Sequence, residues 1–159
     1  MATQYDTDFY AWTQEQAATL RRLAAERANS ELDLEHIAEE IEGVGGSDKR
    51  EVKSRLTTII VHMLKIAYSP AYEPLNGWRG TVNTQRDDLL AIFEQSPSLR
   101  NVARERFAEC YGRAADEAKL SHIDLSLAPI PRQCPFDLDT QVLNPDWLPE
   151  PRIRPPSGC

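Results

Sequence analysis

The chain has 159 residues, of which 41% are hydrophobic and 27% are charged, and this composition is typical of a folded globular protein rather than a disordered one. Its 25 acidic and 18 basic residues give a formal net charge of −7. Proteins that bind a nucleic-acid backbone gather basic side chains, so this balance argues against that class. Binding of nucleic acid is therefore the weakest hypothesis, and it would use Arg21, Arg22, Lys49, Arg50 and Lys53.

Cysteine use and hydropathy indicate where the protein works. Cys110, Cys134 and Cys159 follow no metal-binding spacing, and an odd number of cysteines leaves no complete disulfide framework. The stretch 1–9 lacks the basic start and the apolar run of a secretory signal. The most apolar window, 59–67, is far shorter than the roughly 20 residues that a membrane span needs. We therefore expect a cytoplasmic protein with reduced thiols and no membrane association.

The first half of the chain predicts three amphipathic helices, because apolar residues recur there every three or four positions. The first helix runs from Asp8 to about Ala28. The second runs from Asp33, a natural N-cap, to Val44, where the glycines at positions 43, 45 and 46 predict its end. The third runs from Ser47 to Ala67. The short glycine turn between the second and third helices predicts an antiparallel hairpin.

The second half of the chain predicts two more long helices and a segment of different character. The prolines and the Asn-Gly pair in 69–78 predict a loop, which is followed by helices over 79–95 and 96–119. Prolines are frequent beyond Leu120, with one short helix expected over 137–143. The predicted fold is all-α: a single domain over residues 1–150, a bundle of about five helices with the proline-rich C-terminal segment packed over it, and a flexible tail over 151–159.

The hairpin would bring charged side chains together at the edge of its apolar seam. On helical wheels Glu40 borders the apolar stripe of the second helix, while Arg55 and His62 lie along one edge of the third. Glu40 would then meet Arg55 or His62. A carboxylate beside a histidine suits general acid–base catalysis, and Glu40 with His62 forms a weak metal-ligand pair. The alternative is a partly buried ion pair that fixes the register of the hairpin.

Two sequence motifs that are typical of metal sites on helices are absent from the sequence. It contains no H-E-x-x-H and no symmetrical pair of E-x-x-H motifs, so we expect no metal and no cofactor. Trp78 and Arg86 are candidates for lining a pocket at the mouth of the bundle. Otherwise Trp78 fills the core and Arg86 binds carboxylates or loop carbonyls. His122 is expected to be exposed, and Cys134 to behave as a small buried apolar residue.

Several stretches together resemble the bacterial domain of unknown function family 29, found in cyanobacteria and proteobacteria. They include "LDLEHIAEEIEGVGGSDKREVKSRL", "GWRGTVNTQRDDL" and "CPFDLDTQVLNPDWLPE", and the likeness covers about Tyr5 to Glu150. The resemblance implies an all-helical fold and a bacterial cytoplasmic protein, but no reaction. His36 departs from the pattern, since a small polar residue is usual there. The positions that match are Tyr5, Asp8, Trp12, Glu39, Glu40, Glu42, Ser54, Arg55, His62, Lys65, Trp78, Arg86, Ser96, Pro97, Cys134 and Pro135.

Two functional hypotheses follow from these observations. The first is a helical protein that acts by binding a protein partner or a second copy of itself. The alternative is a metal-dependent or acid–base hydrolase that works through Glu40 and His62, with Arg55 as a further catalytic candidate. Trp78, Arg86 and Lys65 are the corresponding candidates for substrate binding.

Overall fold

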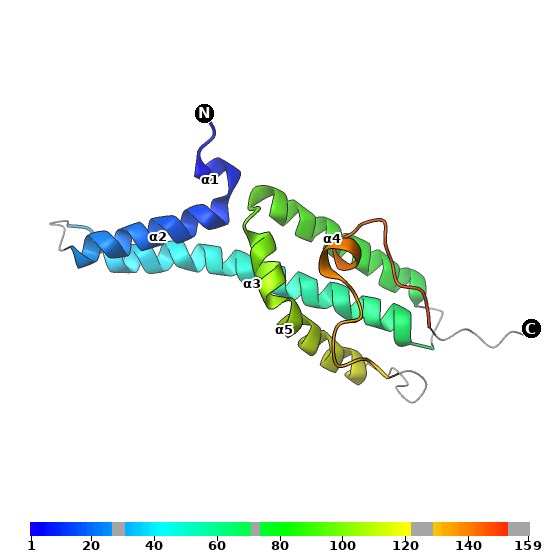
Figure 1. Cartoon of the computed structure of the whole chain (residues 1–159). Helices are drawn as coiled ribbons and strands as arrows, with labels where there is room; N and C mark the ends of the chain where they lie inside the picture. Colours follow the sequence, from blue (N-terminus) through cyan, green and yellow to red (C-terminus); the bar gives the residue numbers. More distant parts are fainter. Residues whose placement is uncertain (27–30, 71–73, 122–128, 153–159) are drawn as a thin grey trace, which may run out of the picture. The chain divides into compact units, whose positions relative to one another are not determined.

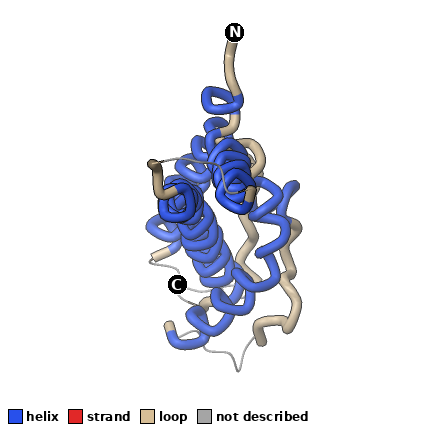
Figure 2. The backbone as a smooth tube through the Cα atoms, turned by 90° about the vertical axis from the view of Figure 1, so that its left-hand side faces the viewer, coloured by secondary structure: helices blue, strands red, loops and turns tan. Residues whose placement is uncertain are grey.

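A computed structural model describes residues 1–26, 31–70, 74–121 and 129–152. These residues form helices joined by turns and loops, with no strand among them, so the predicted all-α class is confirmed (Figures 1 and 2). No helix in the described ranges is both long enough and apolar enough to cross a bilayer. The predictions for His122, for Cys159 and for the tail beyond Arg152 lie outside the described residues.

Contacts between residues divide the chain into two compact units. Unit 1 consists of Met1–Val52 and Ala91–Val102, and unit 2 consists of Lys53–Leu90 and Ala103–Cys159. The long helix α3 (Leu34–Tyr68) contributes its first half to unit 1 and its second half to unit 2.

Unit 1 is built around α2 (Phe9–Ala25) and the first half of α3, which follow the short helix α1 (Gln4–Thr7). Asp8 ends α1 and caps α2, since its Oδ1 accepts a hydrogen bond from the Ala11 N–H at 3.0 Å. The same carboxylate accepts 2.8 Å hydrogen bonds from the backbone N–H and the hydroxyl of Ser98. Asp8 thus joins the start of α2 to the turn that precedes α5 (Leu99–Leu120).

The predicted hairpin between residues 33 and 67 is wrong, because α3 continues through all three glycines as one helix of 35 residues (Figure 1). A glycine inside a helix costs about 1 kcal/mol relative to alanine. The apolar pattern outweighs that cost, since a buried small or apolar residue recurs every seventh position without interruption. These residues are Ala38, Gly45, Val52, Ile59 and Ile66.

Unit 2 contains the second half of α3, residues 75–90 of α4 (Leu75–Gln95) and residues 103–120 of α5. The helices predicted over 79–95 and 96–119 are confirmed with shifted starts. Helix α4 begins inside the predicted loop, and α5 begins after a turn in which the Leu99 N–H donates to the Ser96 carbonyl at 3.0 Å. The fully buried side chains of this unit include Leu56, Ile59, Ile60, Met63, Leu64, Ile66, Val82 and Leu89.

The proline-rich segment forms part of unit 2. Its predicted short helix is present as the π-helical turn η1 (Leu138–Val142), capped by Asp137, whose Oδ1 accepts from the Thr140 N–H at 2.8 Å. Farther along, the Arg152 N–H donates to the Ala67 carbonyl at 2.9 Å, and the Arg152 guanidinium lies 4.8 Å from the centre of the Tyr68 ring. Four apolar side chains of the segment are buried, namely Phe136, Leu138, Val142 and Leu143.

Candidate functional site

The structure does not bring Glu40 beside His62. Both side chains belong to the continuous helix α3, where the 22 positions between them make about six turns. Glu40 is exposed to solvent. The predicted meeting required the chain to reverse at the glycines, and without that reversal neither Arg55 nor His62 can approach Glu40. The ion pair that was to fix the hairpin register is absent for the same reason.

Arg55 instead joins α3 to α4 within unit 2. Its Nη1 donates to Asp88 Oδ2 at 2.7 Å and to Gln85 Oε1 at 3.2 Å. The ion pair is partly exposed on both sides, with side-chain exposures of 24% for Arg55 and 48% for Asp88. Partly exposed ion pairs of this kind contribute little to stability.

Of the other residues predicted to act in catalysis or substrate binding, His62 and Lys65 lie on α3 and Trp78 lies on α4. His62 is half-buried, and its Nδ1 lies 2.9 Å from the Thr58 carbonyl oxygen, which fixes Nδ1 as the protonated ring nitrogen. Lys65 and Trp78 are half-buried, on α3 and α4 respectively. Trp78 lies in the first turn of α4, where its backbone N–H donates to the Pro74 carbonyl at 3.0 Å.

Arg86 is fully buried and holds the C-terminal segment by its backbone. Its Nε donates to the Val142 carbonyl at 2.9 Å, while its Nη2 donates to the carbonyls of Gln141 at 3.3 Å and Trp147 at 3.1 Å. Burial lowers the pKa of the guanidinium, and the charge of Asp87 opposes that shift. This agrees with the sequence alternative in which Arg86 binds loop carbonyls.

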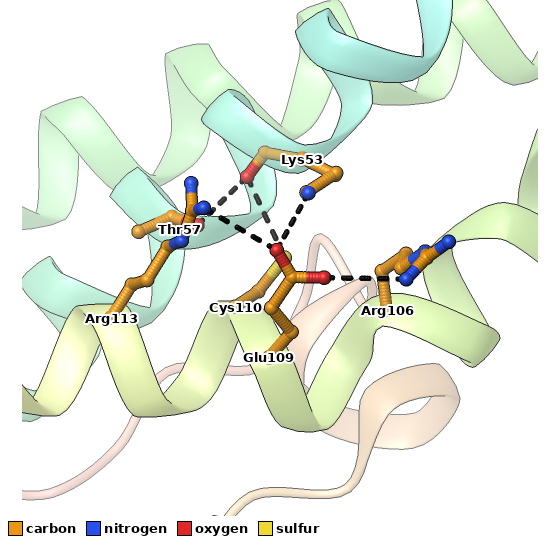
Figure 3. Close-up of polar contacts among 6 residues, drawn as sticks. All are labelled: Lys53, Thr57, Arg106, Glu109, Cys110 and Arg113. Atoms are coloured by element: carbon orange, nitrogen blue, oxygen red, sulfur yellow. Dashed lines mark hydrogen bonds and ion pairs between the residues drawn. The ribbon is translucent and has the colours of Figure 1, made fainter.

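A second polar cluster links α3 to α5 in unit 2 and is centred on Glu109 (Figure 3). Its Oε1 lies 2.6 Å from Lys53 Nζ and 3.5 Å from Arg113 Nη2, and its Oε2 lies 3.5 Å from Arg106 Nη1. The hydrogen bond from Lys53, together with the charges of Lys53, Arg113 and Arg106, holds the pKa of Glu109 below its usual range. The carboxylate therefore stays ionised and serves as the shared counter-ion of three cations.

The described cysteines are free thiols, and Cys134 is partly exposed. Cys110 is fully buried, and its Sγ lies 3.7 Å from the Lys53 carbonyl. Burial raises the pKa of both Cys110 and Cys134. A raised pKa keeps a thiol protonated and poorly nucleophilic. The sequence predicts that Cys134 is buried, whereas the structure leaves it partly exposed.

Two of the cavities differ in chemical character. One of about 560 Å³ lies in unit 2 among residues of the C-terminal segment, including Phe136, Trp147 and Arg152. Another of about 300 Å³ lies in unit 1, where Asp6, Asp48 and Glu51 line it beside two aromatic rings. Within the described residues, no three His, Cys, Asp or Glu side chains are close enough together to hold a metal ion.

Helices α2 and α3 of unit 1 pack through small residues. A Cβ built on Gly45 would overlap Thr13 Oγ1 and lie 2.9 Å from Gln14 Nε2. Thr13, Ala17 and Ala38 are each no more than 1% exposed. The two helices run antiparallel, since Thr13 lies beside Gly45 whereas Arg21 pairs with Glu42 (Figure 1). Their axes therefore approach closely along this seam of small residues.

The large apolar side chains all lie to one side of the seam. At about 100° per residue, Leu20 and Leu23 are rotated about −60° and −120° from Ala17, and four residues of α3 are rotated between about −40° and −120° from Ala38. When two antiparallel helices lie side by side, a rotation in the same sense about each helix axis, counted from the seam, leads to the same face of the pair. We call this surface the α2–α3 apolar face, and its members are Leu20, Leu23, Leu34, Ile37, Ile41 and Val44.

The ion pair on the opposite side confirms this geometry. Arg21 and Glu42 are each rotated about +40° from the seam, and their side chains meet there. On the apolar face, Val44 is 50% exposed and the other five members are partly exposed. The sequence predicts amphipathic helices here, and its pattern does not indicate what covers their apolar stripes. The signal that could have placed them on an open face is the small-residue seam Ala38 and Gly45, seven positions apart.

Comparisons with known proteins place this architecture in a family. A solved structure, that of an alpha-helical protein of unknown function from Rhodospirillum rubrum ATCC 11170, is similar with a TM-score of 0.75 and 32% sequence identity. The similarity covers 92% of this chain and 93% of that one. No curated protein matches. The model of the domain of unknown function DUF29 matches residues 4–148. With nearly its whole length matched, the chain belongs to the DUF29 family.

Proposed function

We propose that the protein is a helical interaction module whose α2–α3 apolar face packs against helices of a protein partner. The observation that carries the proposal is the gathering of six large apolar side chains, all partly or largely exposed, on one side of two antiparallel helices. Full burial of one Leu, Ile or Val side chain stabilises by about 1.5–3 kcal/mol. A partner that covers the face would gain part of that free energy at each position. Contiguous exposed apolar patches commonly mark protein-binding sites.

The proposal places the protein in the bacterial cytoplasm. This is supported by the free thiols of Cys110 and Cys134, since a reducing compartment keeps thiols unpaired. The similar solved structure comes from a bacterium. The hydrolase alternative receives no comparable support, because Glu40 and His62 lie about six helical turns apart on α3.

Site-specific photo-cross-linking in cells tests the proposal. A photoreactive amino acid is placed at Val44, on the face, or at Ala18, an exposed position of α2 rotated about +100° from Ala17 and therefore off the face. We expect a protein adduct of defined mass from position 44 and none from position 18. Equal labelling from both positions, or no adduct from position 44, would contradict the proposal.

A further inference from the structure

We infer that the cavity of about 300 Å³ in unit 1 binds the ammonium end of an alkyl amine, between aromatic rings of α1 and α2 and carboxylates of α1 and α3. Its volume is at the lower end of ligand cavities in proteins, so a small amine, or the side chain of one lysine, suffices to fill it. The inference goes beyond the proposed function, because none of the six residues of the α2–α3 apolar face lines this cavity.

One part of the cavity wall is aromatic. Tyr5 and Phe9 line it, and their ring centres lie 5.4 Å apart in an edge-to-face arrangement. The ring of Trp12 contacts both, at 4.9 Å from Tyr5 and 5.8 Å from Phe9. Tyr5 is 53% exposed, so a ligand can reach its ring from solvent. The face of an aromatic ring attracts cations, and its apolar surface suits the methylene groups of an alkyl chain, so this wall favours an organic cation.

The charged side chains of the cavity wall are all negative. Asp6, Asp48 and Glu51 line it, and no lysine, arginine or histidine does so among the described residues. Asp6 also belongs to the cap of α1, where its Oδ2 accepts from the Thr3 N–H at 2.9 Å and from the Thr3 hydroxyl at 2.7 Å. Negative potential in the cavity therefore agrees with the aromatic wall in favouring a cation.

Asp48 is a carboxylate without a counter-ion among the residues that the structure describes. It is half-buried, and its side chain makes no hydrogen bond or ion pair to any of them. Burial, and then the negative charge of Glu51, raises the pKa of Asp48. A half-buried carboxylate without a partner costs stability, and a bound cation would offset that cost. Asp48 is therefore the residue that we expect to contact the ammonium group.

The carboxylates suit an ammonium group better than a metal ion. Within the described residues no three acidic, histidine or cysteine side chains lie close enough together to hold a metal, and this includes the three carboxylates of the cavity. A primary ammonium group has three N–H donors that point in different directions, so separate acceptors can satisfy it. Gln95 also lines the cavity and adds an amide oxygen to these acceptors.

Titration of the full chain with n-butylammonium tests the inference. In two-dimensional NMR spectra of the 15N-labelled protein, we expect saturable shifts confined to the amides around the cavity. The neutral control is 1-butanol, which has the same chain without the charge and should give far weaker shifts. Shifts of equal size with 1-butanol, or shifts spread over the whole acidic surface, would overturn the inference, because they would indicate unspecific association.

Variants separate binding from folding. Asp48→Asn removes the charge at nearly constant size and should weaken n-butylammonium binding about tenfold or more, while the melting temperature does not fall. Tyr5→Leu removes the ring but keeps an apolar side chain, so it should also weaken binding. The matched control is Glu15→Gln, which removes the same charge from an exposed position of α2 outside the cavity and should leave binding unchanged. Wild-type binding by Asp48→Asn would overturn the inference.

Two further probes distinguish the sources of the ammonium group. Putrescine represents a free amine, and Nα-acetyl-lysine methylamide represents a lysine of another protein. The probe that binds more tightly identifies the source, and the absence of binding by n-butylammonium and by both probes would overturn the inference. None of these results bears on the cross-linking test at Val44, so the proposed function and this inference can fail separately.

Discussion

At the scale of single residues, Arg86 is the clearest case of a side chain used for structure. A fully buried guanidinium donates three hydrogen bonds, all to backbone carbonyls of the C-terminal segment. Its Nη1 has no hydrogen-bond partner among the described residues. The sequence alone could suggest that Arg86 binds loop carbonyls, but not which ones, because every residue carries a carbonyl.

Replacement of Arg86 by methionine should destabilise the protein strongly. The variant keeps much of the side-chain length but leaves three carbonyls without their donor, which should cost about 3 kcal/mol or more. Chemical denaturation measures this loss. Arg86→Lys keeps the charge but not the forked donor geometry, so it should recover only a small part of the stability. Wild-type stability in Arg86→Met would contradict the anchoring role.

Asp48 provides a prediction about pH. Burial, and secondarily the charge of Glu51, raises the pKa of Asp48 above its ordinary value of 3.8. The folded state therefore binds this proton more tightly than the unfolded state, and stability falls as the pH rises through the interval between the two pKa values. Asp48→Asn should raise the melting temperature near pH 7 and have little effect near pH 3.

The control for this pH experiment is Glu15→Gln, which removes the same charge from an exposed position of α2. It should change the melting temperature little at either pH. A stabilisation by Asp48→Asn that persisted unchanged at low pH would show that removal of the charge is not its cause.

At the scale of elements, the predicted helices are present, and the main error lies at the glycines of α3. Three glycines within four positions usually end a helix, and the sequence cannot distinguish a terminating glycine from one that admits a neighbouring helix. Gly45 is of the second kind, because Thr13 and Gln14 occupy the space that a Cβ would fill. The predicted hairpin, and with it the predicted contact of Glu40 with His62, depended on that distinction.

Two glycines of α3 should respond in opposite ways to alanine. A Cβ on Gly43 meets nothing within 4 Å, so Gly43→Ala should stabilise by about 0.5–1 kcal/mol through helix propensity. Gly45→Ala should destabilise, because the buried Thr13 must move to admit the methyl group. Adding Thr13→Ala to the second variant should restore part of the loss. Thermal unfolding measures all three, and equal effects of the two single substitutions would contradict the close packing at Gly45.

At the scale of the whole molecule, composition and motif spacing predicted the helical class and the family, since both depend on patterns spread along the chain. The open apolar face could not be predicted in this way. A stripe of Leu, Ile and Val looks the same in sequence whether its own chain covers it or another does. The difference lies in which residues form the seam with the neighbouring helix, and here the small residues Thr13, Ala17, Ala38 and Gly45 do so.

The contacts of Arg86 also bear on how freely this family can diverge. A main-chain carbonyl is present whatever amino acid occupies the position, so substitutions at Gln141, Val142 or Trp147 leave the acceptors of the anchor in place. Insertion or deletion of a single residue between positions 142 and 147 would displace one acceptor relative to the other two. The C-terminal segment should therefore tolerate amino-acid substitutions far better than any change in its length.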